Sequence, residues 1–284
     1  MSEPVASNAM TVPDTPSNYQ ERWVVVTCMG RLAFLRQTMQ QVLDSTRWNY
    51  CLVDYSCPDE CGAWAARTFP TECAQGRVVI VHVPGRATFH KTIALNAGAL
   101  RAIAGGARQL CFLDADTRVS PAFGDCLDAN SRAGRFLITF GRSLTGFLVV
   151  PAQDWSRLGG YDEQFVNWGA EDYEMRVRLR VVGRLSYVAI SPGLLTSLPH
   201  DNELRVRHYA EKNLLASNRS NYARLRRKVH EWTGTDLWSL EPSVRQLCRS
   251  APVRSTPASA SLVRLKQAPQ QPAPRQPRVR RVWG

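Results

Sequence analysis

The sequence predicts an α/β domain in which a mixed β-sheet is flanked by helices. Short β-branched runs alternate with helical segments through the first 120 of its 284 residues, and acidic motifs follow the apolar runs. Such alternation implies a parallel sheet covered on both faces, whose ligands bind beyond the carboxyl ends of the strands. The composition, 44% hydrophobic and 21% charged, is that of an ordinary globular chain and requires no second core.

The individual elements of the first half follow from local pattern. Apolar runs short enough for buried parallel strands lie at residues 23–28, 50–54, 78–83 and 109–113. Apolar residues recur at helical spacing in 32–43 and 93–104, and 57–69 opens with a Pro-Asp turn that can continue as a helix.

The second half is less regular. Short strands are expected at 136–140 and 146–150, a helix at 172–182, and one long basic helical stretch at 205–231. The first strand is followed by Met29-Gly30-Arg31 rather than by a Gly-x-Gly-x-x-Gly motif, and the chain has no Gly-x-x-x-x-Gly-Lys motif. The usual dinucleotide and P-loop interpretations are therefore disfavoured.

The net charge of +12 and the isoelectric point of about 9.7 point to a polyanionic partner. Residues 251–284 carry seven Lys or Arg, six Pro and no acid, which predicts a basic disordered tail. An anionic membrane surface is a candidate partner for that tail. Nucleic acid is disfavoured because few aromatic residues accompany the basic ones.

The eight cysteines include no Cys-x-x-Cys pair. Cys57 and Cys61 are the closest pair, and no histidine stands at a finger-like distance, which argues against zinc. Cys28 and Cys111 are expected to be buried thiols. The leader at 1–20 is polar, and no apolar stretch approaches the 18 or so residues of a membrane span, so we expect a cytoplasmic protein with a mobile leader.

Three motifs bear chemistry. Asp114-Ala115-Asp116 follows a strand, where paired carboxylates can hold a hard divalent cation, although a strand-terminal turn fits as well. Gly-Gly-Tyr-Asp-Glu at 159–163 and Trp-Gly-Ala-Glu-Asp-Tyr-Glu at 168–174 combine acids with glycines and a tryptophan face suited to a sugar ring. Helix-dipole stabilisation also explains acids there. His200 is a third candidate, either as a metal ligand or as an exposed loop histidine.

The order of these motifs resembles that of nucleotide-sugar glycosyltransferases of the GT-A fold. Within the family 2 type, the chain is most similar to the β-1,4-galactosyltransferase and chondroitin-polymerase group over residues 23–213. Residues 89–98 resemble the segment Phe-Asn-Arg-Ala-Lys-Leu-Leu-Asn-x-Gly, and residues 114–116 resemble Asp-x-Asp. Residues 159–174 resemble Gly-Gly-x-Asp-Glu-x-Phe…Trp-Gly-x-Glu-Asp, the longest and most specific match.

The resemblance implies a UDP-sugar donor held through Mn²⁺ or Mg²⁺. It assigns the metal to Asp116 and His200, with Asp114 beside them. It assigns donor or nucleotide contacts to Thr27, Arg31, Asp54, Lys91, Asn96, Asp114 and Asp116. Lys91 stands where the family has Arg, which keeps the charge and loses the bidentate fork. Asp54 is followed by Tyr-Ser-Cys rather than by Asn or Asp and then Gly-Ser, which leaves the nucleotide open.

The resemblance also implies the catalytic half. Asp172 corresponds to the general base, Glu171 to a sugar contact, and Trp168 with Gly169 to the sugar platform. Direct displacement on a hydroxyl acceptor of a glycan would invert the anomeric centre. The implied division is a nucleotide-sugar-binding half at 21–120 and an acceptor half at 121–235.

Three alternatives stay open. A retaining polypeptide N-acetylgalactosaminyltransferase-like enzyme shares Trp-Gly-Gly-Glu and a downstream His, but has Asn where this chain has Asp172. A basic nucleic-acid or membrane-binding protein is the second. A pseudoenzyme is the third, and the intact set of acids with His200 argues against it.

Overall fold

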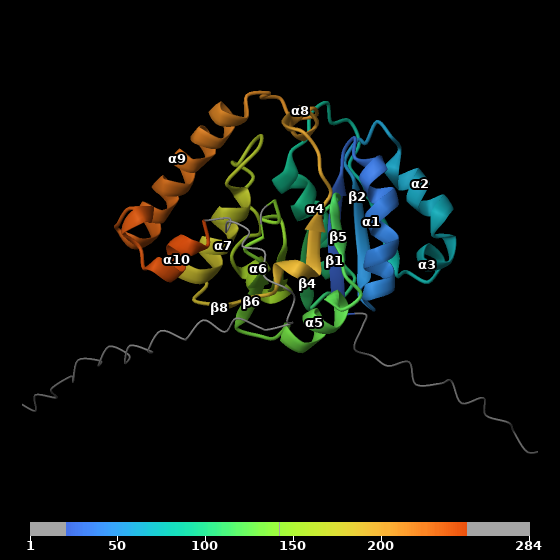
Figure 1. Ribbon diagram of the computed structural model, residues 1–284, viewed down its shortest axis with the longest axis horizontal. Helices are drawn as coiled ribbons and strands as arrows, with labels where there is room; N and C mark the ends of the chain where they lie inside the picture. The colour runs from blue at the N-terminus through green and yellow to red at the C-terminus, as the bar shows by residue number, and fades with distance from the viewer. Residues whose placement is uncertain (1–20, 142, 249–284) are drawn as a thin grey trace, which may run out of the picture.

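A seven-stranded mixed sheet forms the centre of the protein, in the order β3-β2-β1-β4-β7-β6-β8 (Figure 1). The computed structural model describes residues 21–141 and 143–248. The predicted leader at 1–20 and the basic tail at 251–284 lie outside the described residues. The predicted α/β class, with a mixed sheet flanked by helices, is confirmed.

The parallel half of the sheet contains the four predicted strands. They are β1 (Arg22–Cys28), β2 (Asn49–Asp54), β3 (Val78–His82) and β4 (Gln109–Asp114). β1 lies between β2 and β4, parallel to both. Its residues from Trp23 to Cys28 are all buried, because helices cover both faces, and this accounts for the unbroken apolar run.

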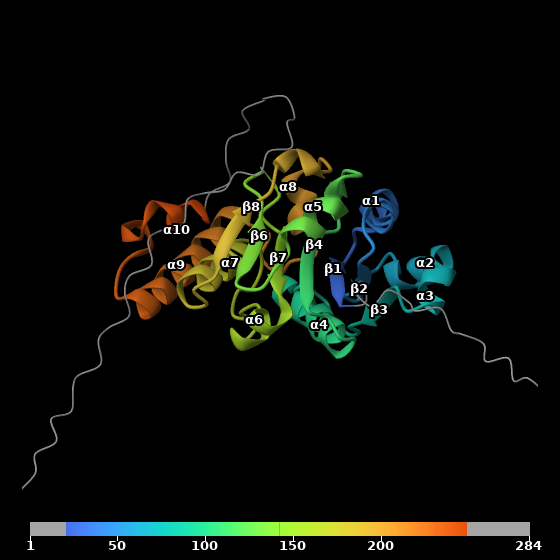
Figure 2. The ribbon, with the colours of Figure 1, turned by 90° about the horizontal axis from the view of Figure 1, so that it is seen from below.

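Helices pack on both faces of this half-sheet. Figure 2 shows α1 (Leu32–Ser45) and α5 (Phe123–Asn130) on one face, and α4 (Lys91–Ala104) and α6 (Ala152–Arg157) on the other. Gly98 lets α4 approach closely, since a Cβ there would lie 2.5 Å from Cγ1 of Val25. The predicted 57–69 segment forms α2 (Cys61–Thr68), which is followed by α3 (Pro70–Ala74).

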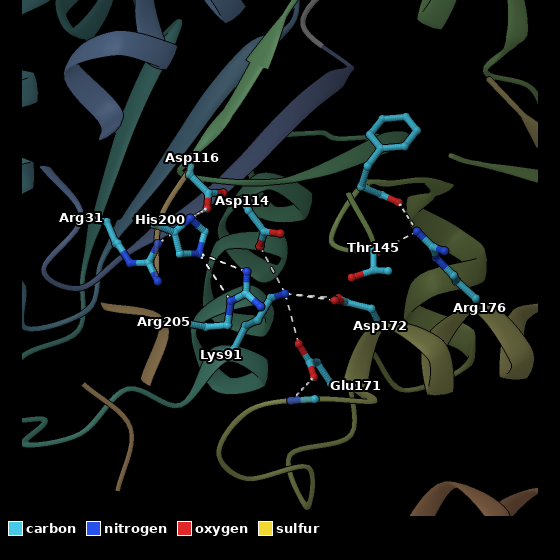
Figure 3. A network of polar contacts seen from close by, with 12 residues as sticks. Arg31, Lys91, Asp114, Asp116, Thr145, Glu171, Asp172, Arg176, His200 and Arg205 are labelled. Carbon is cyan, nitrogen blue, oxygen red and sulfur yellow. Dashed lines mark hydrogen bonds and ion pairs between the residues drawn. The ribbon is translucent and has the colours of Figure 1, made fainter. Parts of the chain in front are cut away.

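The second half adds antiparallel pairs. β7 (Leu148–Pro151) pairs antiparallel with β4 and with β6 (Arg135–Ile138), and β6 pairs parallel with β8 (Ser186–Ala189). The predicted helix at 172–182 is α7 (Glu171–Val181). Its first turn stands beyond the carboxyl ends of the parallel strands, next to the Asp-x-Asp motif (Figure 3).

A small ribbon that the sequence pattern does not reveal brings distant segments together. β5 (Thr117–Val119) pairs antiparallel with β9 (Leu195–Ser197), which follows the 3₁₀ turn η1 (Pro192–Leu194). The Leu198 N–H continues the pairing by donating to the Asp116 carbonyl oxygen at 2.8 Å. This register carries the residues after β9 to the Asp-x-Asp motif.

The prediction of one helix at 205–231 is wrong. The segment divides into α8 (Asn202–Val206) and α9 (Leu214–Thr233). The Asn213 side chain caps α9 by accepting from two backbone N–H groups at 3.0 Å, so a new helix begins there. The Lys212 ammonium fills the break by donating to carbonyl oxygens of Val206, Arg207 and Tyr209. After α9 come η2 (Leu237–Ser239) and α10 (Pro242–Gln246).

Across the described ranges, none of the helices combines the length and apolar character that crossing a membrane requires.

Candidate active site

A cavity of about 240 Å³ opens beyond the carboxyl ends of β1 and β4. Most of the predicted site residues line it: Thr27, Arg31, Lys91, Asp114, Asp116, Trp168, Gly169, Glu171, Asp172 and His200. They come from strand ends, helix starts and the loop after β9, so the sheet edge gathers them as expected for this fold class.

Lys91, the first residue of α4, is the centre of the charged network (Figure 3). Its Nζ lies 3.2 Å from Asp114 Oδ1, 3.1 Å from Glu171 Oε1 and 3.1 Å from Asp172 Oδ2. Burial opposes the charge on Lys91, but the three carboxylates outweigh burial and raise its pKa well above the ordinary value. The ammonium is therefore a permanent positive charge in the cavity wall.

Asp172 and Glu171 begin α7, where the helix dipole favours negative charge. The backbone enters this helix through Gly169 and Ala170, with φ of 109° and 66°. The Gly169 N–H donates to Glu171 Oε2 at 3.1 Å, and this hydrogen bond fixes the Glu171 carboxylate. Burial raises the pKa of Asp172 to about 7, with Lys91 opposing and Glu171 adding to the rise. A carboxyl group with that pKa suits proton transfer at neutral pH.

Asp116 and His200 meet although 84 positions separate them. His200 Nδ1 lies 3.1 Å from Asp116 Oδ2 and 3.1 Å from the Leu198 carbonyl oxygen. Arg31 Nη1 lies 3.6 Å from the same Asp116 oxygen. Burial and the neighbouring Asp114 raise the pKa of Asp116, against the lowering effect of Arg31. A carboxylate oxygen and an imidazole nitrogen are donors that Mn²⁺ accepts, so this pair fits the implied metal.

The Asp114 side chain does not point toward the proposed metal site, as its predicted role as a third metal ligand would require. Its carboxylate faces Lys91 rather than the pair of Asp116 and His200 (Figure 3). Of the three predicted metal ligands, the structure brings Asp116 and His200 together, whereas Asp114 contacts Lys91 at the start of α4.

Trp168 lies on the wall beside these groups, and its backbone is fixed from α9. The backbone N–H of Trp168 donates to Ser217 Oγ at 3.0 Å, and that hydroxyl donates back to the Trp168 carbonyl oxygen at 2.7 Å. The Arg205 guanidinium lies 5.5 Å from the centroid of the Trp168 ring. Arg205 Nε also lies 3.4 Å from His200 Nε2, so this arginine joins the tryptophan to the histidine.

Two predicted donor contacts lie off the cavity. Asp54 accepts hydrogen bonds from the backbone N–H groups of Cys57 and Gly62, each at 2.9 Å, and so supports the loop after β2. Asn96 exchanges hydrogen bonds of 2.9 Å with the Tyr161 backbone and donates to Glu163. Both side chains hold loops in place, since their polar atoms are already engaged by these loops.

Five cavity residues come from the segment predicted as one basic helix and were not predicted as site residues: Arg205, His208, Tyr209, Asn218 and Tyr222. Their spacing carries no signal of a site, because the break between α8 and α9 decides how this segment meets the cavity. Asn213 is a residue type that often caps helices, so the start of α9 could be suspected there. The apolar residues on either side keep helical spacing, however, and this hides the break.

Comparison with known families adds an independent finding. Residues 135–191 match the family model described as the N-terminal domain of galactosyltransferase. The matched segment contains both the Gly-Gly-Tyr-Asp-Glu and the Trp-Gly-Ala-Glu-Asp motifs, on which the resemblance mainly depends. The match covers residues 135–191 of the 284-residue chain, and over that segment the chain is similar to galactosyltransferases.

Several solved structures are similar at low identity. Staphylococcus aureus TarS residues 1–349 in complex with UDP shares 9% identity over 79% of this chain and 77% of that one, with a TM-score of 0.47. GlyE of Streptococcus pneumoniae TIGR4 shares 18% identity over 48% and 36%, with a TM-score of 0.35. Galactosyltransferase LgtC with donor and acceptor sugar analogs shares 12% over 50% and 61%, also at 0.35.

The chain spans about half the length of another TarS 1–349 structure that it matches, 52% of that chain. Comparison with curated protein sequences gives no significant match.

Proposed function

We propose that this chain is a metal-dependent inverting glycosyltransferase that moves a hexose or N-acetylhexosamine from a UDP-sugar to a hydroxyl group of a glycan. The observation that carries the proposal is one cavity with two charged centres. Asp116 and His200 form the first, and Lys91, Glu171 and Asp172 form the second. One centre suits a diphosphate, and the other suits an attacking hydroxyl.

The donor end depends on positive charge. Asp116 and His200 would hold Mn²⁺ or Mg²⁺, and the bound cation stabilises the negative charge that collects on the departing nucleoside diphosphate. Arg31 and Arg205 border the same pair at 3.6 Å and 3.4 Å, and they add fixed positive charge for the phosphates. The other predicted donor contacts on the cavity wall are Thr27, near the end of β1, Lys91 and Asp114.

The acceptor end depends on Asp172. Its carboxylate takes the proton from the acceptor hydroxyl as that oxygen attacks the anomeric carbon. The pKa of about 7 makes Asp172 a stronger base than an exposed carboxylate while it stays largely ionised just above neutrality. Lys91, 3.1 Å away, favours the ionised form and holds the carboxylate in place.

The sugar is positioned by the wall beside the base. Glu171, buried and fixed by the Gly169 N–H, offers a carboxylate oxygen to sugar hydroxyls. The Trp168 ring offers a flat apolar face. A single displacement inverts the anomeric centre, so an α-linked UDP-sugar gives a β-linked product. Asp172 at the position where retaining relatives have Asn supports the inverting route.

A donor panel tests the proposal. The full chain is heated with UDP-, GDP- and dTDP-sugars, each with and without Mn²⁺, because a ligand that binds only the folded state raises the melting temperature. We expect a shift for UDP-sugars that requires Mn²⁺. The absence of a shift with every nucleotide sugar would overturn the proposal. The proton coupling at the anomeric carbon of the product then separates inversion from retention.

A cytoplasmic location, with residues 251–284 holding the enzyme at an anionic membrane surface, is part of the same proposal. The support is the tail's seven Lys or Arg and absence of acids. Deleting the tail should abolish pelleting with anionic vesicles and leave turnover of a water-soluble acceptor unchanged. Equal pelleting of the truncated and full chains would contradict this role.

A further inference from the structure

Three cysteines meet beside the active site, at the carboxyl edge of the sheet. Cys28 ends β1, Cys57 lies in the loop after β2, and Cys61 begins α2. Their sulfur atoms lie within 4.8 Å of one another, and all three residues are buried. Within 21–141 and 143–248, this is the one group of three or more potential metal-ligating side chains that comes so close.

The spacing of the sulfurs matches a shared metal ion rather than a disulfide. Cys28 Sγ lies 3.8 Å from Cys57 Sγ, far beyond the roughly 2.05 Å of an S–S bond. In a tetrahedral zinc site each Zn–S bond is about 2.3 Å, which places neighbouring sulfurs about 3.8 Å apart. The sulfurs of Cys28 and Cys57 therefore already stand at the separation that tetrahedral zinc coordination requires, and the Cys61 sulfur lies within 4.8 Å of both.

A backbone amide also points at one of these sulfurs, as expected for a thiolate. The Gly30 N–H donates to Cys57 Sγ at 3.3 Å. Amide hydrogens around a sulfur favour negative charge on it, and metal-bound thiolates need such outer partners.

We propose that Cys28, Cys57 and Cys61 bind a zinc ion. Three thiolates occupy three positions of the tetrahedron and leave the fourth position open to a water molecule. Thiolates select a softer cation than the oxygen and imidazole pair of Asp116 and His200 does, so the two sites differ in metal preference.

The bound ion ties two loops at the donor end of the cavity. One loop joins β1 to α1 and carries Arg31, which faces Asp116. The other loop follows β2 and is held at its start by Asp54. Zinc joins Cys28 to Cys57 and Cys61, which follow it by 29 and 33 positions in the sequence. The ion thereby fixes Arg31 relative to the diphosphate of the proposed donor. In the sequence only Cys57 and Cys61 lie close together, and the fold adds Cys28 from the end of β1.

The test measures metal in the full chain, without a histidine tag, produced in zinc-supplemented medium and passed over a chelating resin. Zinc per chain is determined by mass spectrometry for the wild type and three variants. Cys57→Ala removes the central ligand. Cys111→Ala is the matched control, a fully buried cysteine on the neighbouring strand. Asp116→Ala removes the other candidate cation ligand.

We expect one zinc per chain in the wild type, Cys111→Ala and Asp116→Ala, and background zinc in Cys57→Ala. Zinc lost in Asp116→Ala but kept in Cys57→Ala would place the ion in the donor site and overturn the proposal. A second measurement does not depend on a variant that folds. Co²⁺ added to metal-stripped wild-type protein should give an intense thiolate-to-cobalt charge-transfer band. A wild-type chain with neither zinc nor this band would also overturn the proposal.

Discussion

Replacing Lys91 by Met removes the one ammonium that three carboxylates share, while keeping much of the side-chain volume. The Lys91 side chain is 12% exposed, so water cannot take its place freely. Removing one partner of a buried ion pair costs about 3–5 kcal/mol, because charge is left uncompensated. Asp172 already has a pKa of about 7 and can take up a proton, so we expect a loss near the lower limit, about 3 kcal/mol.

For a chain of this size, 3 kcal/mol corresponds to a fall of roughly 6–12 °C in melting temperature. The loss should grow with pH. In the variant the folded pKa of Asp172 rises further above its unfolded value, so the folded state binds more protons than the unfolded state does. Stability is then retained in acid and falls as the pH rises toward the folded pKa.

The assay pairs thermal unfolding from pH 5 to pH 9 with the pH profile of kcat/KM. Lys91→Met should need a higher pH to ionise Asp172, because Lys91 lowers the pKa of that carboxyl group. Lys228→Met is the matched control, since Lys228 pairs with Asp162 at 2.6 Å away from the base. It should lower stability without moving the profile. A Lys91→Met chain that unfolds as the wild type does across this range, with an unchanged profile, would refute the reasoning.

Three further predictions concern the catalytic wall. Asp172→Asn should lower turnover by about 10²–10⁴-fold while Mn²⁺-dependent donor binding persists in calorimetry, and turnover close to the wild type would remove Asp172 as the base. The wild-type rate should rise with pH through about 7, because the raised pKa of Asp172 must be exceeded to free its base form; a rate flat from pH 5.5 to pH 8.5 would contradict this. Trp168→Ala should raise the acceptor KM about tenfold, as expected for losing ~1.4 kcal/mol of contact, with kcat changed less; a fall in kcat alone would contradict the platform role.

The parallel half of the fold was predictable because three of its four strands, β1, β2 and β4, are buried on both faces. Runs such as residues 23–28 must then be apolar throughout, and the pattern is unambiguous. β5 and β9 have three residues each, and each has an intermediate or exposed position within it. So short a pattern cannot be distinguished from a loop, and the ribbon went unpredicted.

The candidate site was predictable where motif and helix start coincide, as at Glu171 and Asp172. The site was less predictable where a tertiary contact decides which side chain an acidic residue faces. Asp114 and Asp116 look equivalent in sequence, yet Lys91 attracts the first and His200 meets the second. Asp54 and Asn96 are residue types that often bind ligands, but nearby backbone N–H groups already donate hydrogen bonds to their side-chain oxygens. Cys28 joins Cys57 only because β1 and β2 are adjacent.

The central claim is that Asp116 and His200 hold a cation that binds the diphosphate of the donor. Its most direct test is calorimetric titration of UDP into the full chain, with and without Mn²⁺, in the wild type and in Asp116→Ala. We predict that Mn²⁺ tightens UDP binding at least about tenfold in the wild type, or ~1.4 kcal/mol, and has no effect in the variant. Equal UDP affinity with and without Mn²⁺ in the wild type would contradict the claim.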